Sequence, residues 1–122
     1  MNLQATHWPT EIRLNKAQKN LEIDFDDDSS IVLPAELLRV ESPSAEVQGH
    51  SPSQKKIIPG RKHVGIMAIE TMGNYAIKIN FDDLHDTGIF TWQYLYELGQ
   101  NQQEIWQQYL AALEENGLSR DP

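Results

Sequence analysis

The sequence contains no cysteine, which excludes disulfides, thiolate metal sites and cysteine nucleophiles. Long apolar runs are also missing, so we expect no membrane-spanning segment. The first ten residues, MNLQATHWPT, lack the basic and apolar regions of a signal peptide, and we expect a cytoplasmic protein. Ten Lys and Arg stand against eighteen Asp and Glu, and the net charge of −8 makes binding to nucleic-acid backbones unfavourable.

Familiar catalytic motifs are absent as well. There is no G-x-S-x-G, no P-loop, no H-E-x-x-H and no dinucleotide-binding fingerprint. The four histidines, at positions 7, 50, 63 and 85, form no pair with the i, i+4 spacing of helical metal ligands. A small hydrolase or isomerase is one hypothesis, but no nucleophile–base pair supports it.

What the chain does contain is the pattern of a small folded domain. Its 122 residues, 39% of them hydrophobic, suit a single domain over 1–122, with a core over about 8–98. Alternating apolar and polar residues predict an antiparallel sheet of about five or six strands, and the Gly73–Asn74 pair predicts a tight hairpin. The expected strands cover residues 10–17, 21–25, 31–33, 63–70, 75–81 and 88–92.

Helical patterns separate and follow these strands. PAELLRV, at 34–40, predicts a short helix, and QYLYELGQ, at 93–100, turns helical. Asn101 and Glu104 have capping-box spacing, which predicts a last helix over about 101–116 that ends near Gly117. Its apolar residues should pack on the sheet, and the fold class is α+β. They are Ile105, Trp106, Tyr109, Leu110 and Leu113.

Residues 41–60 read as a long irregular loop rich in proline, serine and glycine. A basic cluster follows at the end of this loop, and it could dock an anionic partner. The alternative is a solvated loop whose positive charge offsets part of the negative charge of the chain. No aromatic residues alternate with the basic ones, as stacking on nucleic-acid bases would need. The cluster consists of Lys55, Lys56, Arg61 and Lys62.

Two acidic stretches could bind metal. DFDDDSS, at 24–30, places aspartates like an EF-hand loop but lacks the glycine and the glutamate that such a loop needs, which favours a hairpin turn. NFDDLHDTGIF, at 80–90, gathers Asp83 and Asp86 around His85. This set suits a divalent cation, iron included, but aspartate-rich turns are also common between strands. Trp92, just after it, favours a core position over ligand stacking.

Two stretches together resemble a known family. LPAELLRVESPSAEV, at 33–47, and YAIKINFDDLHDTGIFTWQYLYEL, at 75–98, are similar to the small N-terminal domain of gamma-butyrobetaine and trimethyllysine hydroxylases, which bacteria also use as a stand-alone domain of unknown function. The shared features are an L-R pair after the first strands, the D-x-H turn and a W-x-x-L segment. Here they fall on Leu38 and Arg39, on Asp83 to His85, and on Trp92 with Leu95.

The resemblance implies that the zinc site of the hydroxylase domain has been lost in this chain. In the hydroxylases three cysteines and the histidine of the turn hold a structural zinc. The cysteine positions fall here on Ser42, Ser44 and Val47, and His85 alone keeps its ligand identity. Serine is a poor zinc ligand and valine is none, so a tight tetrahedral site is not expected. We expect His85 to hold the turn, hydrogen-bonded to Asp83 or to the loop carrying Ser42 and Ser44.

The family's catalytic iron lies in a separate, larger domain, so the resemblance does not imply oxygenase activity here. The family also occurs fused to carriers of iron–sulfur clusters, which suggests an accessory role in iron handling. Without cysteine, this chain cannot hold a cluster by thiolates.

Two further hypotheses therefore stand beside the hydrolase or isomerase. The first is a non-catalytic adaptor without a cofactor that binds a protein partner. Its contact surfaces would be the 41–63 loop with Lys55, Lys56, Arg61 and Lys62, and the Asp82–Phe90 turn beside Trp92. The second is a weak metal site, with iron as the candidate ion, at His85, Asp83 and Asp86.

Overall fold

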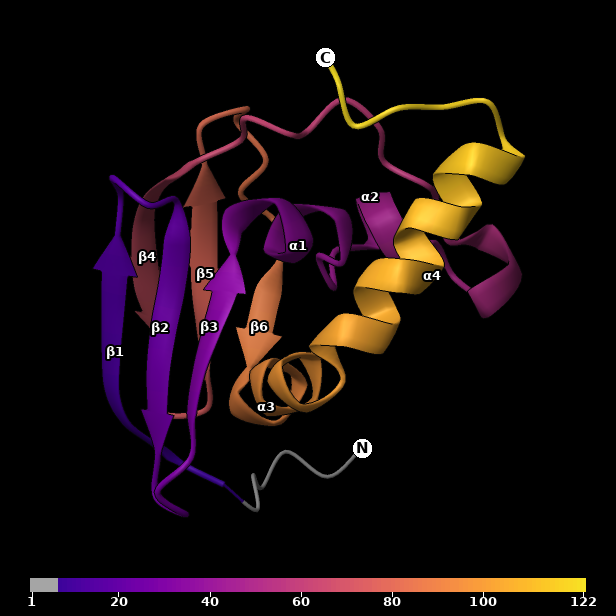
Figure 1. Cartoon of the computed structure of the whole chain (residues 1–122). Coiled ribbons are helices and arrows are strands. Elements are labelled where there is room, and N and C mark those ends of the chain that lie inside the picture. The colour runs from indigo at the N-terminus through magenta and orange to yellow at the C-terminus, as the bar shows by residue number, and fades with distance from the viewer. Residues whose placement is uncertain (1–6) are drawn as a thin grey trace.

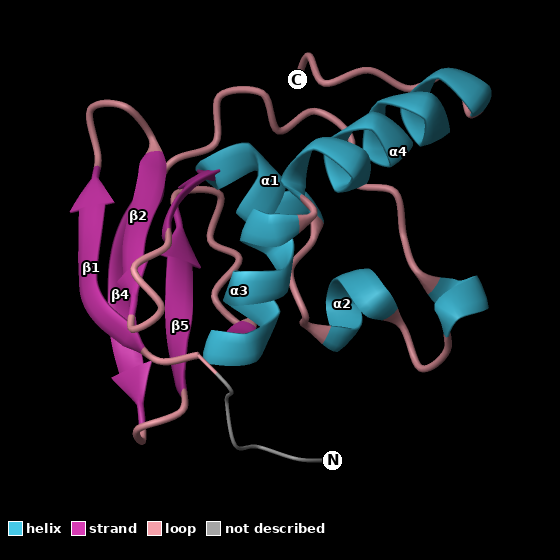
Figure 2. Cartoon of the chain, turned by 60° about the horizontal axis from the view of Figure 1, so that its bottom comes forward, coloured by secondary structure: helices cyan, strands magenta, loops and turns pink. Residues whose placement is uncertain are grey.

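The chain folds into two three-stranded antiparallel meanders that share one core with the helices (Figure 1). A computed structural model describes residues 7–122, so most of the stretch read for a signal peptide lies outside the described residues. Each meander consists of consecutive strands, in the orders β1-β2-β3 and β4-β5-β6. Figure 2 shows that the helices gather on one side of the strands. The predicted α+β class is confirmed.

The first meander follows the predicted alternation. Strand β1 spans Pro9–Asn15, β2 spans Asn20–Phe25 and β3 spans Ser30–Pro34. In β2 every second side chain is buried, because alternate residues of a strand point to the same face. The turn after β2 is closed by the Asp27 carboxylate, which accepts the Ser29 N–H at 3.0 Å. The aspartate-rich stretch is thus a hairpin turn, as its residues favoured.

The second meander contains β4 (Ile66–Met72), β5 (Ala76–Phe81) and β6 (Ile89–Thr91). Strand β4 begins three residues later than predicted, because the Val64 N–H bonds the Arg61 carbonyl in a turn. Gly73 adopts φ +56° in the predicted hairpin, a region that glycine enters at little cost.

Helix α1 (Ala35–Val40) lies where the sequence predicted it, directly after β3. Helix α3 (Trp92–Gln100) begins inside the last predicted strand, because the Thr91 hydroxyl accepts the Tyr94 N–H as an N-terminal cap. Strand β6 is shortened accordingly. Gly99 lets α3 approach β3 closely, since a Cβ there would lie 2.6 Å from Ile31.

Helix α4 (Gln102–Glu115) does not pack on the sheet as predicted. Ile105 and Trp106 reach the edge of the main core, but the buried residues Tyr109 and Leu113 pack on Val40 of α1 and on Ile57 and Ile58, where they form a second, smaller core. The predicted capping box is also wrong. The Asn101 side chain donates to the Glu97 carbonyl at 3.0 Å instead of capping α4.

The segment predicted to be irregular, 41–60, contains two short helical elements. Helix α2 (Ala45–Gln48) starts at Ser44, whose hydroxyl accepts the Glu46 N–H, and η1 spans Pro52–Gln54. Four residues are too few for a helical period to show in the sequence. No helix within residues 7–122 has the length and apolar character that crossing a membrane requires.

Candidate functional site

The Asp82–Phe90 turn leaves the end of β5 and folds back on itself. The Phe81 N–H donates to the His85 carbonyl at 3.0 Å, and the Leu84 N–H donates to the Phe81 carbonyl at 3.1 Å. These two bonds place Leu84 at the tip, with φ +73°. They also direct His85 inward, toward the segment that carries Ser42.

His85 is buried and both of its ring nitrogens have partners. Nε2 lies 2.9 Å from the Ser42 Oγ, and Nδ1 lies 3.1 Å from the Glu46 carboxylate. Burial and the positive charge of Arg39 lower the pKa of His85, against the opposing effects of Glu46 and Asp83. We assign a neutral ring that donates from Nδ1 to Glu46 and accepts the Ser42 hydroxyl at Nε2.

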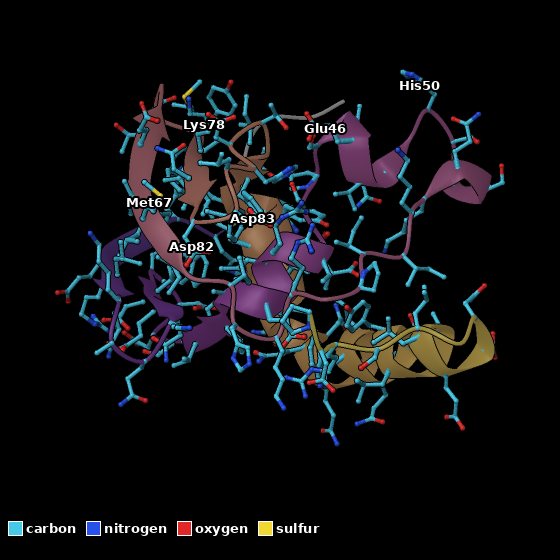
Figure 3. All side chains as sticks on the ribbon, turned by 90° about the horizontal axis from the view of Figure 1, so that it is seen from above. Glu46, His50, Met67, Lys78, Asp82 and Asp83 are labelled. Carbon is cyan, nitrogen blue, oxygen red and sulfur yellow. The ribbon has the colours of Figure 1, made fainter. Side chains whose placement is uncertain are left out.

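The contact between His85 and the Ser42 loop is as predicted, but the part of Glu46 was missed. Glu46 lies in the first turn of α2, which the sequence did not reveal. Figure 3 labels Glu46 and Asp83, the latter on the turn, and shows His50 farther out on the 41–60 segment. Helix α2 therefore serves to bring a carboxylate to the buried imidazole.

Serine, histidine and a carboxylate in this order are the groups of a nucleophilic hydrolase. Here, however, the serine cannot reach a substrate. Ser42 is 0% exposed, and its Oγ also accepts the Ser44 N–H at 3.3 Å. A Cβ on Gly88 would lie 2.3 Å from the Ser42 Oγ, so the turn covers the hydroxyl directly. The three side chains act as a hydrogen-bonded clasp between α2 and the turn.

The same corner corresponds to the structural zinc site of the hydroxylases. Ser44 Oγ is hydrogen-bonded to Thr87 Oγ1 at 2.8 Å, and Val47 is a buried apolar side chain. The donor set is then two hydroxyls, no group from Val47, and one imidazole whose Nε2 is hydrogen-bonded to Ser42. Zinc needs four strong donors, mostly thiolates and imidazoles, so these residues do not fit zinc.

Asp83, predicted beside His85 as a metal ligand, pairs with two arginines instead. Its Oδ2 lies 2.7 Å from Arg39 Nε and 2.8 Å from Arg61 Nε, and its Oδ1 accepts the His85 N–H at 3.2 Å. Burial alone would raise the pKa of Asp83, but the Arg39 hydrogen bond and the other positive partners lower it overall. Asp86, the third predicted ligand, is exposed.

Within residues 7–122, three potential ligand atoms come within 4.8 Å of one another only at His7, Asp26 and Asp27. The Asp27 carboxylate there already accepts hydrogen bonds from Ser29 and Tyr96, at 2.5 and 2.8 Å. The His7 ring stacks on Tyr96 with centroids 3.9 Å apart. These contacts account for the group as turn chemistry and ring packing.

The predicted basic cluster is largely neutralised. Lys55 pairs with Glu41 at 2.7 Å, Arg61 pairs with Asp83, and Lys62 lies 3.6 Å from Asp121. Three of the four cations face a carboxylate, so the cluster does not present a uniform positive surface.

Lys56 and Trp92 complete the predicted contact residues. Lys56 is exposed, and its backbone N–H donates to the Val47 carbonyl. Trp92 is buried and donates its indole N–H to the Asn74 carbonyl at 2.9 Å, which is the core position that its sequence context favoured.

Comparison with known proteins gives one family and several similar structures. Residues 12–96 match the family described as gamma-butyrobetaine hydroxylase-like, N-terminal. Two NMR solution structures of small proteins are 49% and 43% identical to this chain, with TM-scores of 0.83 and 0.84. The alignments cover 97% and 100% of this chain, and 93% and 91% of the two proteins.

A crystal structure from Acidithiobacillus ferrooxidans is also similar, with 37% identity and a TM-score of 0.64. It is described as a protein with unknown function of the DUF971 family, and the alignment covers 75% of this chain and 91% of that one. No curated protein matches the chain.

Proposed function

Since the chain belongs to the gamma-butyrobetaine hydroxylase-like N-terminal family, we propose that it is a non-catalytic module that docks a protein partner through the tip of the Asp82–Phe90 turn. The similar structure from Acidithiobacillus ferrooxidans is described as a protein with unknown function, so membership of the family does not identify a reaction. The proposal depends on one residue, Leu84.

The conformation and the exposure of Leu84 are each unfavourable for a leucine. Its φ of +73° lies in the left-handed region, which costs a residue with a Cβ about 1–2 kcal/mol. Its side chain is 82% exposed, so it forgoes most of the roughly 1.5–3 kcal/mol that burying a leucine provides. A partner that buries Leu84 would account for the exposed side chain, while the two backbone bonds of the turn hold the left-handed φ.

The surroundings of Leu84 support this reading. A shallow hollow of about 330 Å³ lies beside it on the second meander. Its apolar lining includes Met67, which is 53% exposed, and Phe81. Its polar lining includes Asp86 and the ion pair of Lys78 with Glu70 at 3.2 Å. Figure 3 labels Met67 on β4 and Asp82 on the turn. Such a surface suits a partner segment with exposed apolar side chains.

Site-specific crosslinking tests the proposal in cells of the source organism. A photo-reactive benzophenone amino acid replaces Leu84 in one chain and Val32 in another. Val32 is an equally apolar control on β3, 50% exposed. We expect position 84 to capture a defined protein that the unlabelled wild-type chain displaces and the Leu84→Asp chain does not. Identical products from both positions would contradict the proposal.

The finer expectation, that the partner belongs to iron or iron–sulfur metabolism, rests on the resemblance. The first property to determine for the captured protein is therefore whether it takes part in iron or iron–sulfur metabolism. An iron-handling protein captured at position 84 would support it, and a partner from an unrelated process would remove it.

A weak iron site at His85 is the second candidate, because the corner still brings His85 together with Ser42 and Ser44. Iron would have to displace Ser42 or Glu46 from the imidazole, and Asp83 from its arginines. An anaerobic iron(II) titration, followed by zinc(II), tests this in a proton–nitrogen correlation spectrum. Saturable changes confined to this corner and lost in His85→Gln would favour the metal site. An unchanged spectrum at metal excess would exclude it.

A further inference from the structure

A larger hollow, of about 670 Å³, lies where α1, the α3–α4 junction and residues 117–122 meet. Its volume is in the range of small-ligand sites. The wall combines apolar surface with side-chain amides, which suits a polypeptide that has both apolar and hydrogen-bonding groups. The main lining residues are Pro34, Leu37, Trp106, Gln100, Gln102 and Gln103.

One side of this hollow is built around a buried carboxylate. Glu36 is 7% exposed and lies in the first turn of α1. Its two oxygens receive the fork of Arg120, with Nε at 2.8 Å and Nη2 at 2.6 Å. A buried carboxylate needs such a partner, because an unpaired charge loses its hydration without compensation.

The same guanidinium also contacts an aromatic ring. The Arg120 Cζ lies 5.2 Å from the centre of the Trp106 ring, within the range of a cation–π contact. A carboxylate at one edge of the planar group and an indole near it are the two contacts that distinguish guanidinium from a point charge such as ammonium. Glu36 and Trp106 therefore form a built site for an arginine side chain.

The segment that brings Arg120 to this site has a small number of other attachments, among them the ion pair of Lys62 with Asp121 and the bond from the Leu118 N–H to the Leu113 carbonyl. Gly117, at φ +64°, ends α4, and residues 117–122 then run back toward the 60–62 segment (Figure 1). Two backbone bonds hold it there, from the Gly60 N–H to the Ser119 carbonyl at 2.9 Å and from the Lys62 N–H to the Arg120 carbonyl at 3.0 Å. Apart from Arg120, the segment is exposed.

We propose that the Glu36–Trp106 hollow recognises an arginine side chain on a partner polypeptide, and that Arg120, on its wall, holds the guanidinium position as an internal competitor. Charge complementarity supports a basic partner, since the site carboxylate is buried and the chain has a net charge of −8. The three glutamines beside the hollow can bond the backbone of an extended segment. This surface is separate from Leu84, so Leu84→Asp leaves its binding unchanged.

The test removes the Arg120 side chain from the site and supplies an arginine on a separate peptide. Arg120→Gln removes the internal ligand, and the probe is the capped hexapeptide GLSRDP, which has the sequence of residues 117–122. We expect saturable shifts of the Trp106 indole N–H in this variant. In the wild type the apparent affinity should be about fivefold or more weaker, because the tethered Arg120 competes at an effective millimolar concentration.

Controls separate recognition from a structural latch. The capped peptide GLSQDP should not bind, and GLSKDP should bind more weakly than GLSRDP. Arg13→Gln removes another forked arginine–carboxylate pair, with Asp24 at 2.8 and 3.1 Å, and should leave the wild-type behaviour intact. If Arg120→Gln does not fold, Arg120→Lys keeps the charge and should still release the site to GLSRDP.

Two results would overturn the proposal. One is a folded Arg120→Gln chain whose Trp106 signal does not respond to GLSRDP, which would make the Arg120 contact a latch only. The other is equal binding of the arginine and glutamine peptides, which would mean that Glu36 and Trp106 do not read the guanidinium. A response of the wild type to capped aspartate instead would assign the hollow to anions and also refute it.

Discussion

Replacing Asp83 with asparagine should destabilise the fold far more than a surface substitution does. Asp83 receives two guanidinium groups on one oxygen, and the Arg39 side chain is only 9% exposed. Within the described residues, Arg39 Nη1 is buried without a hydrogen-bond partner, so Asp83 is the main compensation for this charge. Asp83→Asn keeps the shape but leaves a buried cation unpaired.

The magnitude follows from the burial of the three partners. Removing one member of a fully buried ion pair costs about 3–5 kcal/mol. Asp83 is 21% exposed and Arg61 34%, which lets water compensate part of the loss. We therefore expect Asp83→Asn to lower the free energy of unfolding by roughly 2–4 kcal/mol.

Urea unfolding followed by tryptophan fluorescence measures this loss. Asp121→Asn is the matched control, since Asp121 is exposed and lies 3.6 Å from Lys62, and its cost should be about 0–1 kcal/mol. Adding Arg39→Met to Asp83→Asn should recover part of the loss, because the unpaired charge is removed. Equal costs for Asp83→Asn and Asp121→Asn would refute the reasoning.

Two further predictions concern the clasp between α2 and the turn. Gly88→Ala should lower the free energy of unfolding, measured in urea, by more than about 1 kcal/mol, because the new Cβ would lie 2.3 Å from the Ser42 Oγ. Adding Ser42→Gly should recover this loss. Additive losses in the double variant would contradict the contact. The pKa of His85 is lowered, so below about pH 6.5 the unfolded chain takes up a proton that the folded chain resists. The free energy of unfolding should therefore fall from pH 7 toward pH 5 more steeply in the wild type than in His85→Asn. The charges that face the ring are Glu46, Asp83 and Arg39. Parallel pH curves for the two proteins would contradict this prediction.

The strands were predictable because their signal is local. Alternation in residues such as Leu21, Ile23 and Phe25 records burial on one face directly in the sequence. Helix α2 carries no such record in four residues, and the start of α3 depends on the single hydroxyl of Thr91. Thr91 stands directly before Trp92, and a threonine in that position is a signal for a helix start.

The site was predictable only in part, for a physical reason. The position of His85 beside Ser42 followed from the resemblance, since substituted ligands still occupy one corner. The pairing of Asp83 with Arg39 joins residues 44 apart, and no local pattern specifies which charge meets which. The orientation of α4 likewise depends on Ile57 and Ile58, which lie in a segment without periodicity.

The division into two meanders of consecutive strands has a consequence for the order of folding. Each meander pairs neighbours in sequence, so its loop-closure entropy is small and it can form early. The contacts of Ser42 with His85 and of Arg39 with Asp83 close loops of 43 and 44 residues and should form last. Asp83→Asn should then accelerate unfolding while leaving the folding rate nearly unchanged, a φ-value of about 0–0.3. A slower folding rate would place this corner in the nucleus instead.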